Sequence, residues 1–491
     1  MTEICQTGCA TPVVKVEMSL PEIIAILPLL ILFAGSVVVM LTIAWKRHHG
    51  ATMILSAASL ALALACMVAV ADRVPQRVGS LLIVDGYATF FGCLLISAAF
   101  AVVLLSYPYL EARSDESEEY YVLLIVATLG AVVLVSSAHF ASFFLGLEIL
   151  GVSLYGLIGY RRGSAGVEAA MKYLVLAAIS SAFLLFGMAL MYAQTGSLEF
   201  SQIAGRSTEG GLTVLLATGL LVTGIGFKLA VVPFHMWTPD VYEGAPAPVS
   251  AFVASVSKGA VFALALRYFS TLDIQSSPAL LAAFSVVAVA SMIAGNLLAL
   301  LQDNVKRMLA YSSIAHLGYL LVAFVASGEM RPVAVGYYLA AYFITIVGAF
   351  GVIGALSGPK RDLGRLEELA GLAWDKPWHA AIFTAMLLSL AGIPLTAGFI
   401  GKFYLIATGI GSSLWLPVLC LLATSAIGLF YYIRVILVMF TRREASRPEQ
   451  RLGASYLSGT VLAALCAALL FVGMYPTPLI GIIRDTVATL K

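Results

Sequence analysis

The stretch that decides the fold spans Thr223–Ala260 and reads TGIGFKLAVVPFHMWTPDVYEGAPAPVSAFVASVSKGA. It holds Lys228 in an apolar run, Pro233 and His235 shortly after it, and Lys258 in the next apolar run. An ionisable side chain in the middle of a lipid-length segment is costly and usually marks an ion path or a proton relay. A proline breaks the hydrogen-bond ladder of such a helix, which is tolerated where the freed groups line a polar cavity enclosed by protein. We therefore expect a broken membrane helix that brings charged residues into the membrane interior.

The composition is that of a polytopic membrane protein. Of the 491 residues, 61% are hydrophobic and only 11% are charged, whereas a soluble domain has about 25% charged residues. The net charge of +2 gives no reason to expect a nucleic-acid partner. The six cysteines include no CxxC pair, which argues against zinc and iron–sulfur sites. Cys5 and Cys9, which precede the first span, could form a disulfide in an oxidising compartment.

Fourteen apolar runs of about 20 residues or more are candidate membrane helices. They lie at roughly 21–45, 51–71, 80–107, 119–137, 138–160, 164–193, 212–236, 247–270, 278–301, 303–327, 332–357, 379–408, 414–440 and 453–475. The first run is too long for a signal-peptide core, so we expect an uncleaved first span. The sequence thus predicts an all-α polytopic membrane protein with about 14 transmembrane helices and no soluble domain.

A second candidate break lies at Pro394, eight residues before Lys402, in LSLAGIPLTAGFIGKFYLI. It falls in helix 12, five helices after the break at Pro233 in helix 7. Helices 4–8 and 9–13 are therefore interpreted as two five-helix repeats, and the odd number of helices forces the second repeat to be inverted. The predicted divisions are 1–118 for helices 1–3, 119–270 and 278–440 for the two repeats, and 441–491 for helix 14 and the C-terminal tail.

The lysines and arginines of the loops predict the orientation of the chain. Fifteen lie in loops after odd-numbered helices and eight lie on the opposite side, so we expect odd-numbered loops in the cytoplasm and both termini outside. The repeat pairs Lys228 with Lys402 and Lys258 with Arg434. The remaining five basic residues lie inside predicted helices and are Lys172, Lys228, Lys258, Lys402 and Arg434.

Glu148 lies near the middle of helix 5, and the repeat pairs its position with the region of His316 in helix 10. A buried carboxylate is pushed toward its neutral form unless a cation lies nearby. Lys172, on the next helix, is the candidate partner for Glu148. The alternative is a static buried ion pair that only holds two helices together.

Lys228, Lys258 and Lys402 have no comparable carboxylate partner inside a helix. Because a low-dielectric environment favours the neutral amine, a buried lysine can release its proton near neutral pH and act as a proton carrier. In the alternative, the long side chain reaches the lipid headgroups. That alternative fits Lys402 better than the other two lysines.

His235 and His316 are candidate proton relays between lysines, because imidazole takes and gives protons near neutral pH at two nitrogens. Either could instead form a hydrogen bond between helices. We expect Asp240 and Glu243 to cap or bridge the loop after the broken helix, and Asp85 to cap helix 3. The sequence has no dinucleotide, Walker, GxSxG or haem-attachment motif, so we expect no redox chemistry in this chain.

The segment from Lys228 to Lys258, with PFHMWTPDVYEGAPAPVSAF within it, closely resembles the signature of the antiporter-like membrane subunits of respiratory NADH–quinone oxidoreductase, complex I. LGLEIL around Glu148, the helix of Lys172, YSSIAHLGY and AGFIGKF extend the resemblance across helices 4–13. The resemblance implies a proton relay, driven by quinone reduction elsewhere in the complex. Its implied members are Glu148, Lys172, Lys228, Lys258 and Lys402, with His235 and His316 as linkers.

Among these subunits the chain is most similar to the N-type. Lys402 stands where the M-type carries glutamate, and the chain ends soon after helix 14, where the L-type has a long lateral helix. The resemblance implies a multi-pass protein of the bacterial cytoplasmic membrane with both termini in the periplasm. Its implied partners are the lipid bilayer and other membrane-arm subunits, including a second antiporter-like subunit and small membrane subunits. FMN, iron–sulfur clusters, quinone and NADH would belong to the rest of the complex, and this chain would hold no cofactor or metal.

Two alternative functions stay open at this point. A subunit of a multi-subunit cation/proton antiporter of the Mrp type shares the fold and most of the lysines. A purely structural membrane anchor is the third possibility, and it predicts that the membrane lysines can be replaced without loss of proton pumping.

Overall fold

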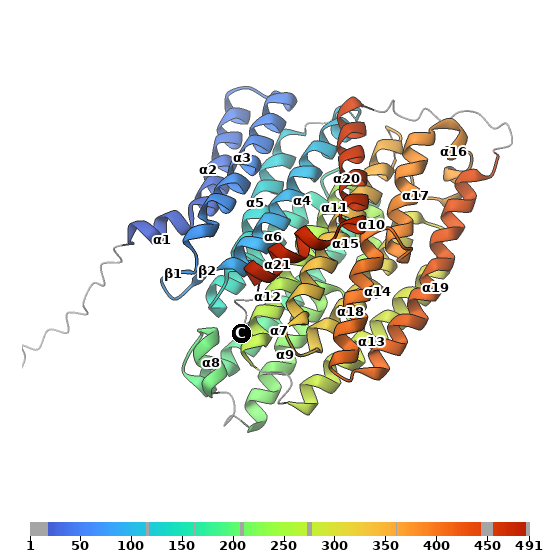
Figure 1. Cartoon of the computed structure of the whole chain (residues 1–491). Helices are drawn as coiled ribbons and strands as arrows, with labels where there is room; N and C mark the ends of the chain where they lie inside the picture. The colour runs from blue at the N-terminus through green and yellow to red at the C-terminus, as the bar shows by residue number, and fades with distance from the viewer. Residues whose placement is uncertain are drawn as a thin grey trace, which may run out of the picture.

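A computed structural model shows a bundle of long helices that run roughly side by side (Figure 1). The structure describes residues 18–113, 117–161, 163–206, 211–272, 277–359, 361–442 and 455–487. Thirteen of the described helices are long and apolar enough to cross a membrane. The shorter helices α17 (Pro377–Ala391) and α18 (Ala397–Gly411) together take the place of the twelfth predicted span. The all-α polytopic fold expected from the sequence is confirmed. Cys5 and Cys9, the candidate disulfide pair, lie outside the described residues.

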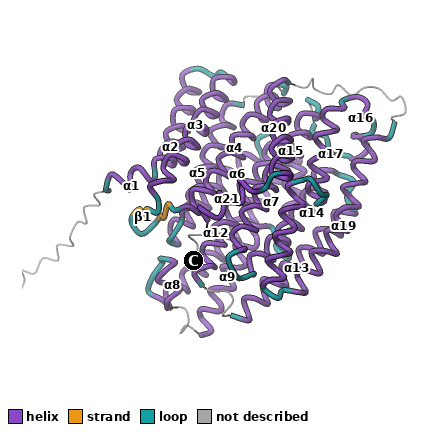
Figure 2. The backbone as a smooth tube through the Cα atoms, viewed as in Figure 1, coloured by secondary structure: helices purple, strands orange, loops and turns teal. Residues whose placement is uncertain are grey.

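The N-terminal part adds a β-hairpin that the sequence analysis did not predict (Figure 2). The hairpin pairs β1 with β2 antiparallel, with Gln76 opposite Val84. The predicted first span is divided in two, and Pro28 lies in the first turn of its second helix, where a missing N–H costs no hydrogen bond. The elements of this part are α1 (Leu20–Ala25), α2 (Leu27–Trp45), α3 (His49–Val70), η1 (Ala71–Arg73), β1 (Gln76–Val78), β2 (Leu82–Val84) and α4 (Gly86–Glu111).

Two groups of helices follow with the same order of packing. In the first group α5 packs against α6 and α12, and α7 packs against α9; in the second α13 packs against α14 and α19, and α15 packs against α17 and α18. The first group comprises α5 (Glu118–Ser136), α6 (Phe140–Ile158), α7 (Ser164–Thr195), α8 (Phe200–Arg206), α9 (Gly211–Leu229), α10 (Trp237–Gly244), α11 (Ala247–Phe252), the π-helical turn η3 (Val253–Ser257) and α12 (Lys258–Thr271). The second comprises α13 (Pro278–Leu300), α14 (Val305–Val325), α15 (Met330–Leu356), η5 (Leu366–Leu369), α16 (Leu372–Asp375), α17, α18 and α19 (Trp415–Phe440).

The core lies where the two groups meet. The span made of α11, η3 and α12 is wholly buried, and α14 is almost wholly buried. These elements are held together because α11 packs on α15 and α10 packs on α14. Lys258 and His316 therefore lie on the helices that the rest of the bundle shields most completely from lipid.

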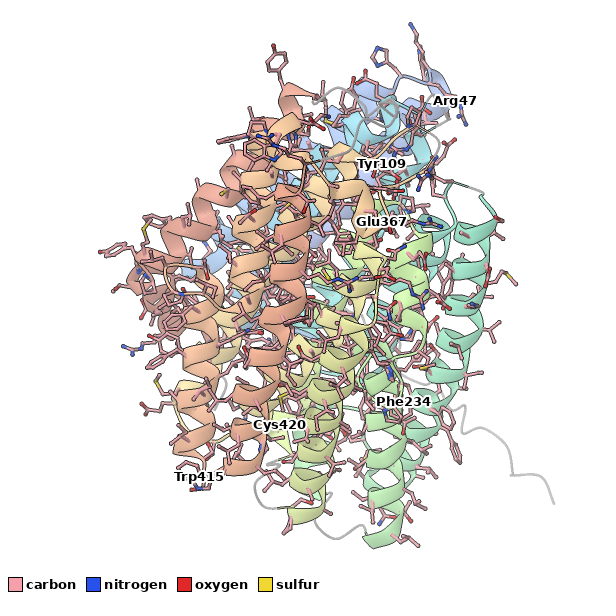
Figure 3. All side chains as sticks on the ribbon, turned by 90° about the vertical axis from the view of Figure 1, so that its right-hand side faces the viewer. Arg47, Tyr109, Phe234, Glu367, Trp415 and Cys420 are labelled. Carbon is pink, nitrogen blue, oxygen red and sulfur yellow. The ribbon has the colours of Figure 1, made fainter. Side chains whose placement is uncertain are left out.

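The loops alternate between two faces of the bundle, as the predicted topology requires. On one face Arg161 donates to the Pro359 carbonyl, and this hydrogen bond joins the loops that follow α6 and α15. On the other face Arg77 pairs with Glu199, and this ion pair joins the loops that follow α3 and α7. Figure 3 shows Arg47, in the first loop, near one end of the bundle, and Trp415, the first residue of α19, at the opposite end.

Both predicted helix breaks are present, and each begins before its proline. Helix α9 ends at Leu229, and the next residue, Ala230, has φ 60°. Helix α17 ends at Ala391 and is followed by Gly392 with φ 82°. A proline ring clashes with the carbonyl four residues earlier, so a helix cannot extend normally into Pro233 or Pro394.

The C-terminal part is more ordered than the tail expected from the sequence. After α20 (Tyr456–Met474), the short helix α21 (Thr477–Val487) crosses the bundle and packs on α4 and α15 (Figure 1). Its buried residues Ile480, Ile483 and Val487 are three and four positions apart, which is the spacing of one helical face. Their burial explains why this segment lies against the bundle.

Candidate functional site

Lys228 lies at the end of α9, directly before the first break. The residue is 5% exposed, and its Nζ has no hydrogen-bond partner among the described residues. It faces α6, because a Cβ built on Gly151 would lie 3.7 Å from Nζ. Glu148, one turn earlier on α6, interacts electrostatically with this ammonium group. The site thus contains a buried amine, that of Lys228, which interacts with the charge of Glu148 but forms no hydrogen bond with the described residues.

The predicted pairing of Glu148 with Lys172 is wrong in this structure. Ser181 Oγ donates to Glu148 at 2.6 Å, whereas Lys172 Nζ binds Glu168 and Asp240, each at 2.8 Å. Lys172 and Ser181 are nine residues apart on α7, which is about two and a half turns. They therefore lie on nearly opposite sides of the helix, and only the side of Ser181 faces Glu148.

Asp240 and Glu243 bridge α10 of the first group to α14 of the second group, in agreement with the expectation of a bridging role. Arg307, at the start of α14, donates to Asp240 at 2.7 Å and to Glu243 at 2.8 Å. Asp240 also accepts from Lys172. A continuous ionic network thus links α7, α10 and α14 at one face of the bundle.

His235 lies in the turn after the first break, between Lys228 and Lys258 along the chain. Its side chain is buried and has no side-chain hydrogen-bond partner in the part of the chain that the structure describes. The ammonium group of Lys258 interacts with the imidazole electrostatically. His235 is thus a buried titratable group that lies between Lys228 and Lys258 along the chain and is linked electrostatically to Lys258.

Lys258 lies in the centre of the bundle, directly after the π-helical turn η3. It is 1% exposed, and its Nζ donates to Ser313 Oγ on α14 at 2.9 Å. The ammonium group also lies over the rings of Tyr242 and Trp237, 5.1 and 5.9 Å from their centroids. Aromatic faces and one hydroxyl stabilise a cation without fixing its protonation state as a carboxylate would.

His316 lies one turn after Ser313 on α14 and has hydrogen bonds at both ring nitrogens. Nδ1 is 2.6 Å from the Tyr338 hydroxyl and Nε2 is 3.1 Å from the Tyr432 hydroxyl. Tyr432 also contacts the hydroxyl of Ser312. The sequence left open a relay or a helix–helix hydrogen bond, and the geometry allows one side chain to serve as both.

Lys402 lies on α18 beside the second break. Its Nζ donates to the carbonyls of Leu390 and Ala391, both at 2.9 Å, and to Ser425 Oγ at 2.7 Å. The lysine thus caps the C-terminal end of α17, where the helix dipole favours a cation. It is 7% exposed, so its side chain does not reach the surface as the alternative interpretation required.

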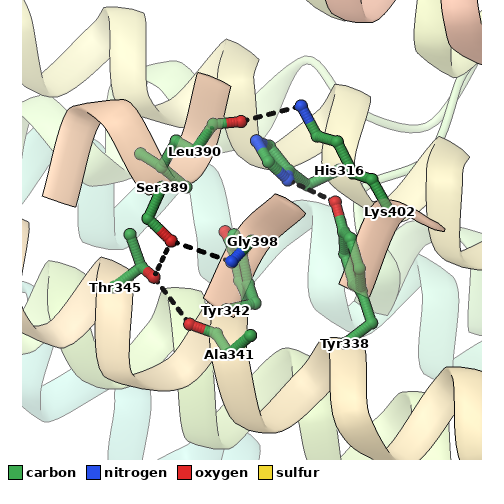
Figure 4. A pocket seen from close by; sticks show the side chains of 9 residues that line it. All are labelled: His316, Tyr338, Ala341, Tyr342, Thr345, Ser389, Leu390, Gly398 and Lys402. Carbon is green, nitrogen blue, oxygen red and sulfur yellow. Dashed lines mark hydrogen bonds between the residues drawn. The ribbon is translucent and has the colours of Figure 1, made fainter. Parts of the chain in front are cut away.

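His316 and Lys402 both line a cavity of about 10 Å³, which is room for about one water molecule (Figure 4). Its polar lining includes the hydroxyls of Tyr342, Thr345 and Ser389. Figure 4 shows the side chains of His316 and Lys402 on the same side of this cavity, with Tyr338 beneath the imidazole. A proton could therefore pass between the two residues through one bridging molecule.

Arg434 does not have an environment like that of Lys258, with which the repeat pairs it. Its side chain is 40% exposed and forms an ion pair with Asp303 at 2.6 Å. The pairing of Lys228 with Lys402 agrees better with the structure, since both amines are buried beside a helix break.

Comparisons with known proteins show what this chain is similar to. The family described as NADH:quinone oxidoreductase/Mrp antiporter, TM, matches residues 137–428, more than half of the chain. A chain of respiratory complex I from Thermus thermophilus, solved with bound aureothin, is 34% identical with a TM-score of 0.79, over 92% of this chain and 98% of that chain. The chain belongs to the NADH:quinone oxidoreductase/Mrp antiporter family.

Two further structures show how widely this family's fold is used. A chain of the membrane-bound sulfane sulfur reductase, an archaeal respiratory membrane complex, has 25% identity and a TM-score of 0.82, over 96% of this chain and 98% of that chain. A chain of the Mrp complex from Dietzia sp. DQ12-45-1b has 21% identity and a TM-score of 0.83 with the same coverage, and shows the fold alone. The protein is thus an antiporter-like membrane subunit of complex I, or of a related complex of the Mrp type or the sulfane sulfur reductase type.

The sequence analysis missed the hydroxyl groups that complete the site of this family member. Ser313 lies within the quoted motif YSSIAHLGY, and its spacing of three from His316 could have marked it as a neighbour on the same helix face. Tyr338 and Tyr432 come from two other helices, and no local pattern in the sequence places them at His316. Among the described residues no group of three or more His, Cys, Asp or Glu could hold a metal ion.

Proposed function

We propose that this chain translocates protons as a subunit of a respiratory NADH–quinone oxidoreductase, most like the N-type. The observation that carries the proposal is a buried set of titratable groups: Lys258 donates to Ser313, His316 lies one turn after Ser313 on α14, and His316 and Lys402 line one small cavity. None of these groups forms an ion pair with a carboxylate among the described residues. The 34% identity to a complex I chain supports this kind of complex.

In this proposal Lys228 is the first buried proton carrier. Its amine has no hydrogen bond to fix its charge, and Glu148 is the nearby anion that favours the protonated form. Protonation of Glu148 removes that negative charge and therefore changes how readily Lys228 gives up its proton. His235 takes the proton toward Lys258, because the ammonium group of Lys258 interacts electrostatically with the His235 imidazole.

The second part of the path starts at Lys258. Its ammonium donates to Ser313, and the hydroxyl can pass a proton on when its own hydrogen reorients. His316 has a second nitrogen on the far side of its ring, which allows uptake on one side and release on the other. Lys402, which lines the same small cavity as His316, receives the proton and is the exit residue.

Lys172 acts on this path through Asp240 rather than through Glu148. It shares Asp240 with Arg307, so a change in the Lys172 ion pair alters the charge balance at the start of α14, which carries Ser313 and His316. In this way the ionic network at the bundle face couples the two groups of helices.

The wider setting belongs to the same proposal. The redox reaction, with NADH, FMN, iron–sulfur clusters and quinone, takes place in other subunits. Further membrane-arm subunits, a second antiporter-like subunit among them, flank this chain in a bacterial cytoplasmic membrane. The loops after odd-numbered helices face the cytoplasm and both termini face the periplasm, which agrees with the excess of basic residues in those loops.

Exchange of protons for cations, as a subunit of an Mrp-type complex, is the second candidate function. The similar fold of the Dietzia chain favours it, although the 21% identity is well below the 34% to the complex I chain. A sodium gradient that drives proton movement in vesicles without NADH would support exchange, and NADH-dependent movement would support the first proposal.

The test is a Lys258→Met variant of the whole complex in membrane vesicles. NADH oxidation by quinone and proton uptake, followed with a pH-sensitive dye, are measured together. We expect proton uptake to fall to background in an assembled complex. Lys46→Met, which removes an exposed lysine from a loop, should leave uptake unchanged. Normal uptake in Lys258→Met would contradict the proposal and favour a purely structural role.

A further inference from the structure

A polar pocket of about 350 Å³ opens at one face of the bundle. This face carries the loops that follow α6, α10, α13 and α15, which correspond to the predicted helices 5, 7, 9 and 11. It lies apart from the buried relay, and no step of the proposed proton path uses it. Four basic residues from three of these loop regions line it, namely Arg161, Lys306, Arg361 and Arg365. The pocket therefore collects positive charge from segments that are far apart in the sequence.

The two acidic residues of the lining are already bound to other groups. Asp362 accepts from the Tyr109 hydroxyl at 2.7 Å, from Lys306 Nζ at 2.9 Å and from the Ala247 N–H at 3.0 Å, and it also pairs with Arg113. Burial alone would raise the pKa of the Asp362 carboxyl, but Lys306 and Arg113 outweigh it and hold this pKa below its usual value. Asp362 is thus a charged, fully occupied acceptor rather than a ligand for a further cation.

Glu243 is bound in a similar way. It accepts from Arg307 at 2.8 Å and from the Asn304 side-chain amide at 2.9 Å. Neither Arg307 nor Arg113 lines the pocket, so cations outside the pocket neutralise much of its acidic charge. Inside the pocket Lys306 pairs with Asp362, and Arg361 pairs with Glu368 outside it, but the lining still holds more basic than acidic residues.

Arg365 and Arg161 are the members of this set that a ligand can reach. Arg365 is exposed and forms no ion pair with any residue that the structure describes. Arg161 is 24% exposed; it donates to the Pro359 carbonyl at 3.2 Å and forms only a long ion pair, at 3.8 Å, with Asp362. The first turn of α7 also borders the pocket, and its N-cap residue Gly163 has no side chain to bind the free backbone N–H groups.

We propose that this pocket binds a phosphate group, carried either by the headgroup of an anionic phospholipid or by a soluble phosphate. Arginine side chains bind phosphate oxygens through paired N–H donors, and basic pockets between membrane helices on the cytoplasmic side bind anionic headgroups. The cavity volume is in the range of small-ligand sites. The outer surface of α7 beside the pocket exposes the apolar residues Val167, Met171 and Val175, along which an acyl chain can lie.

The experiment measures binding to the purified, delipidated complex in detergent. One arm titrates phosphatidylglycerol in mixed micelles, and a second titrates inorganic phosphate, both by calorimetry. The double variant Arg161→Gln/Arg365→Gln should weaken the binding of whichever probe binds by at least about tenfold, since each lost charge-assisted hydrogen bond alone has about that effect. The variant complex should retain proton uptake, because neither arginine belongs to the relay.

The matched control is Lys46→Gln, which removes one positive charge from the same face outside the pocket. Binding of phosphatidylglycerol but not of inorganic phosphate identifies a lipid headgroup as the source of the phosphate, and binding of inorganic phosphate identifies a soluble ligand. The proposal is wrong if neither probe binds, or if the double variant binds both probes as the Lys46→Gln complex does.

Discussion

Buried charge occurs in two different forms in this protein, one at the ends of the bundle and one in its interior. At the ends every buried charge has a counter-charge: Asp362 binds Lys306 and Arg113, and Asp85 forms a two-pronged ion pair with Arg267 at 2.7 and 2.8 Å. In the interior Lys228, Lys258 and Lys402 form no ion pair with any described carboxylate. Hydroxyls, carbonyls or aromatic rings surround Lys258 and Lys402, whereas Lys228 has no hydrogen bond and Glu148 acts on it only electrostatically.

This difference separates residues that hold the structure from residues that can change charge. A carboxylate beside an ammonium stabilises the charged form of both groups over a wide pH range. A hydroxyl or a carbonyl stabilises a cation less strongly, so the neutral amine stays accessible. We infer that the paired charges fix the loops and that the unpaired lysines carry protons.

The largest effect on stability should come from Asp362→Ala. The change leaves Lys306, which is 1% exposed, without its counter-charge, and breaking a buried pair costs about 3–5 kcal/mol. Chemical unfolding of the complex in detergent measures this cost. The matched control is Asp303→Ala, whose carboxylate is 83% exposed in its pair with Arg434, and its cost should stay below about 1 kcal/mol. Equal costs would remove the distinction between buried and exposed pairs.

The pH dependence of the Asp362 contribution sharpens the same point. Because the folded-state pKa of Asp362 lies below its usual value of about 3.9, its contribution is fully present above that value and is lost as pH falls through the folded-state pKa. The difference in unfolding free energy between the native chain and Asp362→Asn should therefore be constant from neutral pH down to about pH 4 and shrink below it. A difference that already changes between neutral pH and about pH 5 would contradict this assignment.

Lys402→Met should have an intermediate effect on stability. The variant loses the group that donates to the Leu390 and Ala391 carbonyls at the end of α17, and a hydrogen bond from a charged group contributes about 1.5–3 kcal/mol. Chemical unfolding measures the loss, and Lys402→Arg should recover part of it because it keeps the charge at the helix end. A Met variant as stable as the native chain would show that this amine does not cap α17.

Gly392→Ala should cost somewhat less, about 1–2 kcal/mol, because an L-residue is disfavoured at φ 82°. The added Cβ would also lie 2.9 Å from Lys402 Cδ and so displace that side chain. The opposite change at the first break, Ala230→Gly, relieves a similar conformation at φ 60° and should leave stability unchanged or raise it slightly. The two variants should thus shift the unfolding midpoint in opposite directions, and a shift in the same direction would contradict the account.

The smallest effect on stability is expected for Lys228→Met. Its amine has no hydrogen bond to lose, and an unpaired buried charge is itself costly, so an apolar side chain of similar length should be tolerated or slightly stabilising. Unfolding of the assembled complex measures this, with Lys402→Met as the comparison. A cost as large as that of Lys402→Met would show that Lys228 has a structural partner.

The sequence predicted the parts of this molecule that depend on local pattern. Apolar runs of membrane length give the spans, and Pro233 and Pro394 give the two breaks, because a proline affects only its own helix. The buried positions of Lys228 and Lys258 followed from their places within those runs, whereas the sequence left open whether Lys402 is buried or reaches the lipid headgroups.

The parts that failed depend on helix rotation and on contacts between distant segments. Lys172 lies on the helix after Glu148, but its rotation about α7 turns it toward Asp240. Asp362 lies in a loop and Lys306 in the first turn of α14, and the ion pair that forms between these distant segments had no signal in the sequence. Sequence reasoning has no measure of such rotations, so it can identify the charged residues but not their partners.

The most direct test of the central claim is proton uptake by vesicles that carry the Lys228→Met complex. The account predicts a complex that is assembled and as stable as the native one, but whose NADH-dependent proton uptake falls to background. Normal proton uptake by this variant would contradict the account, because it would show that the unpaired lysine at the first break carries no proton.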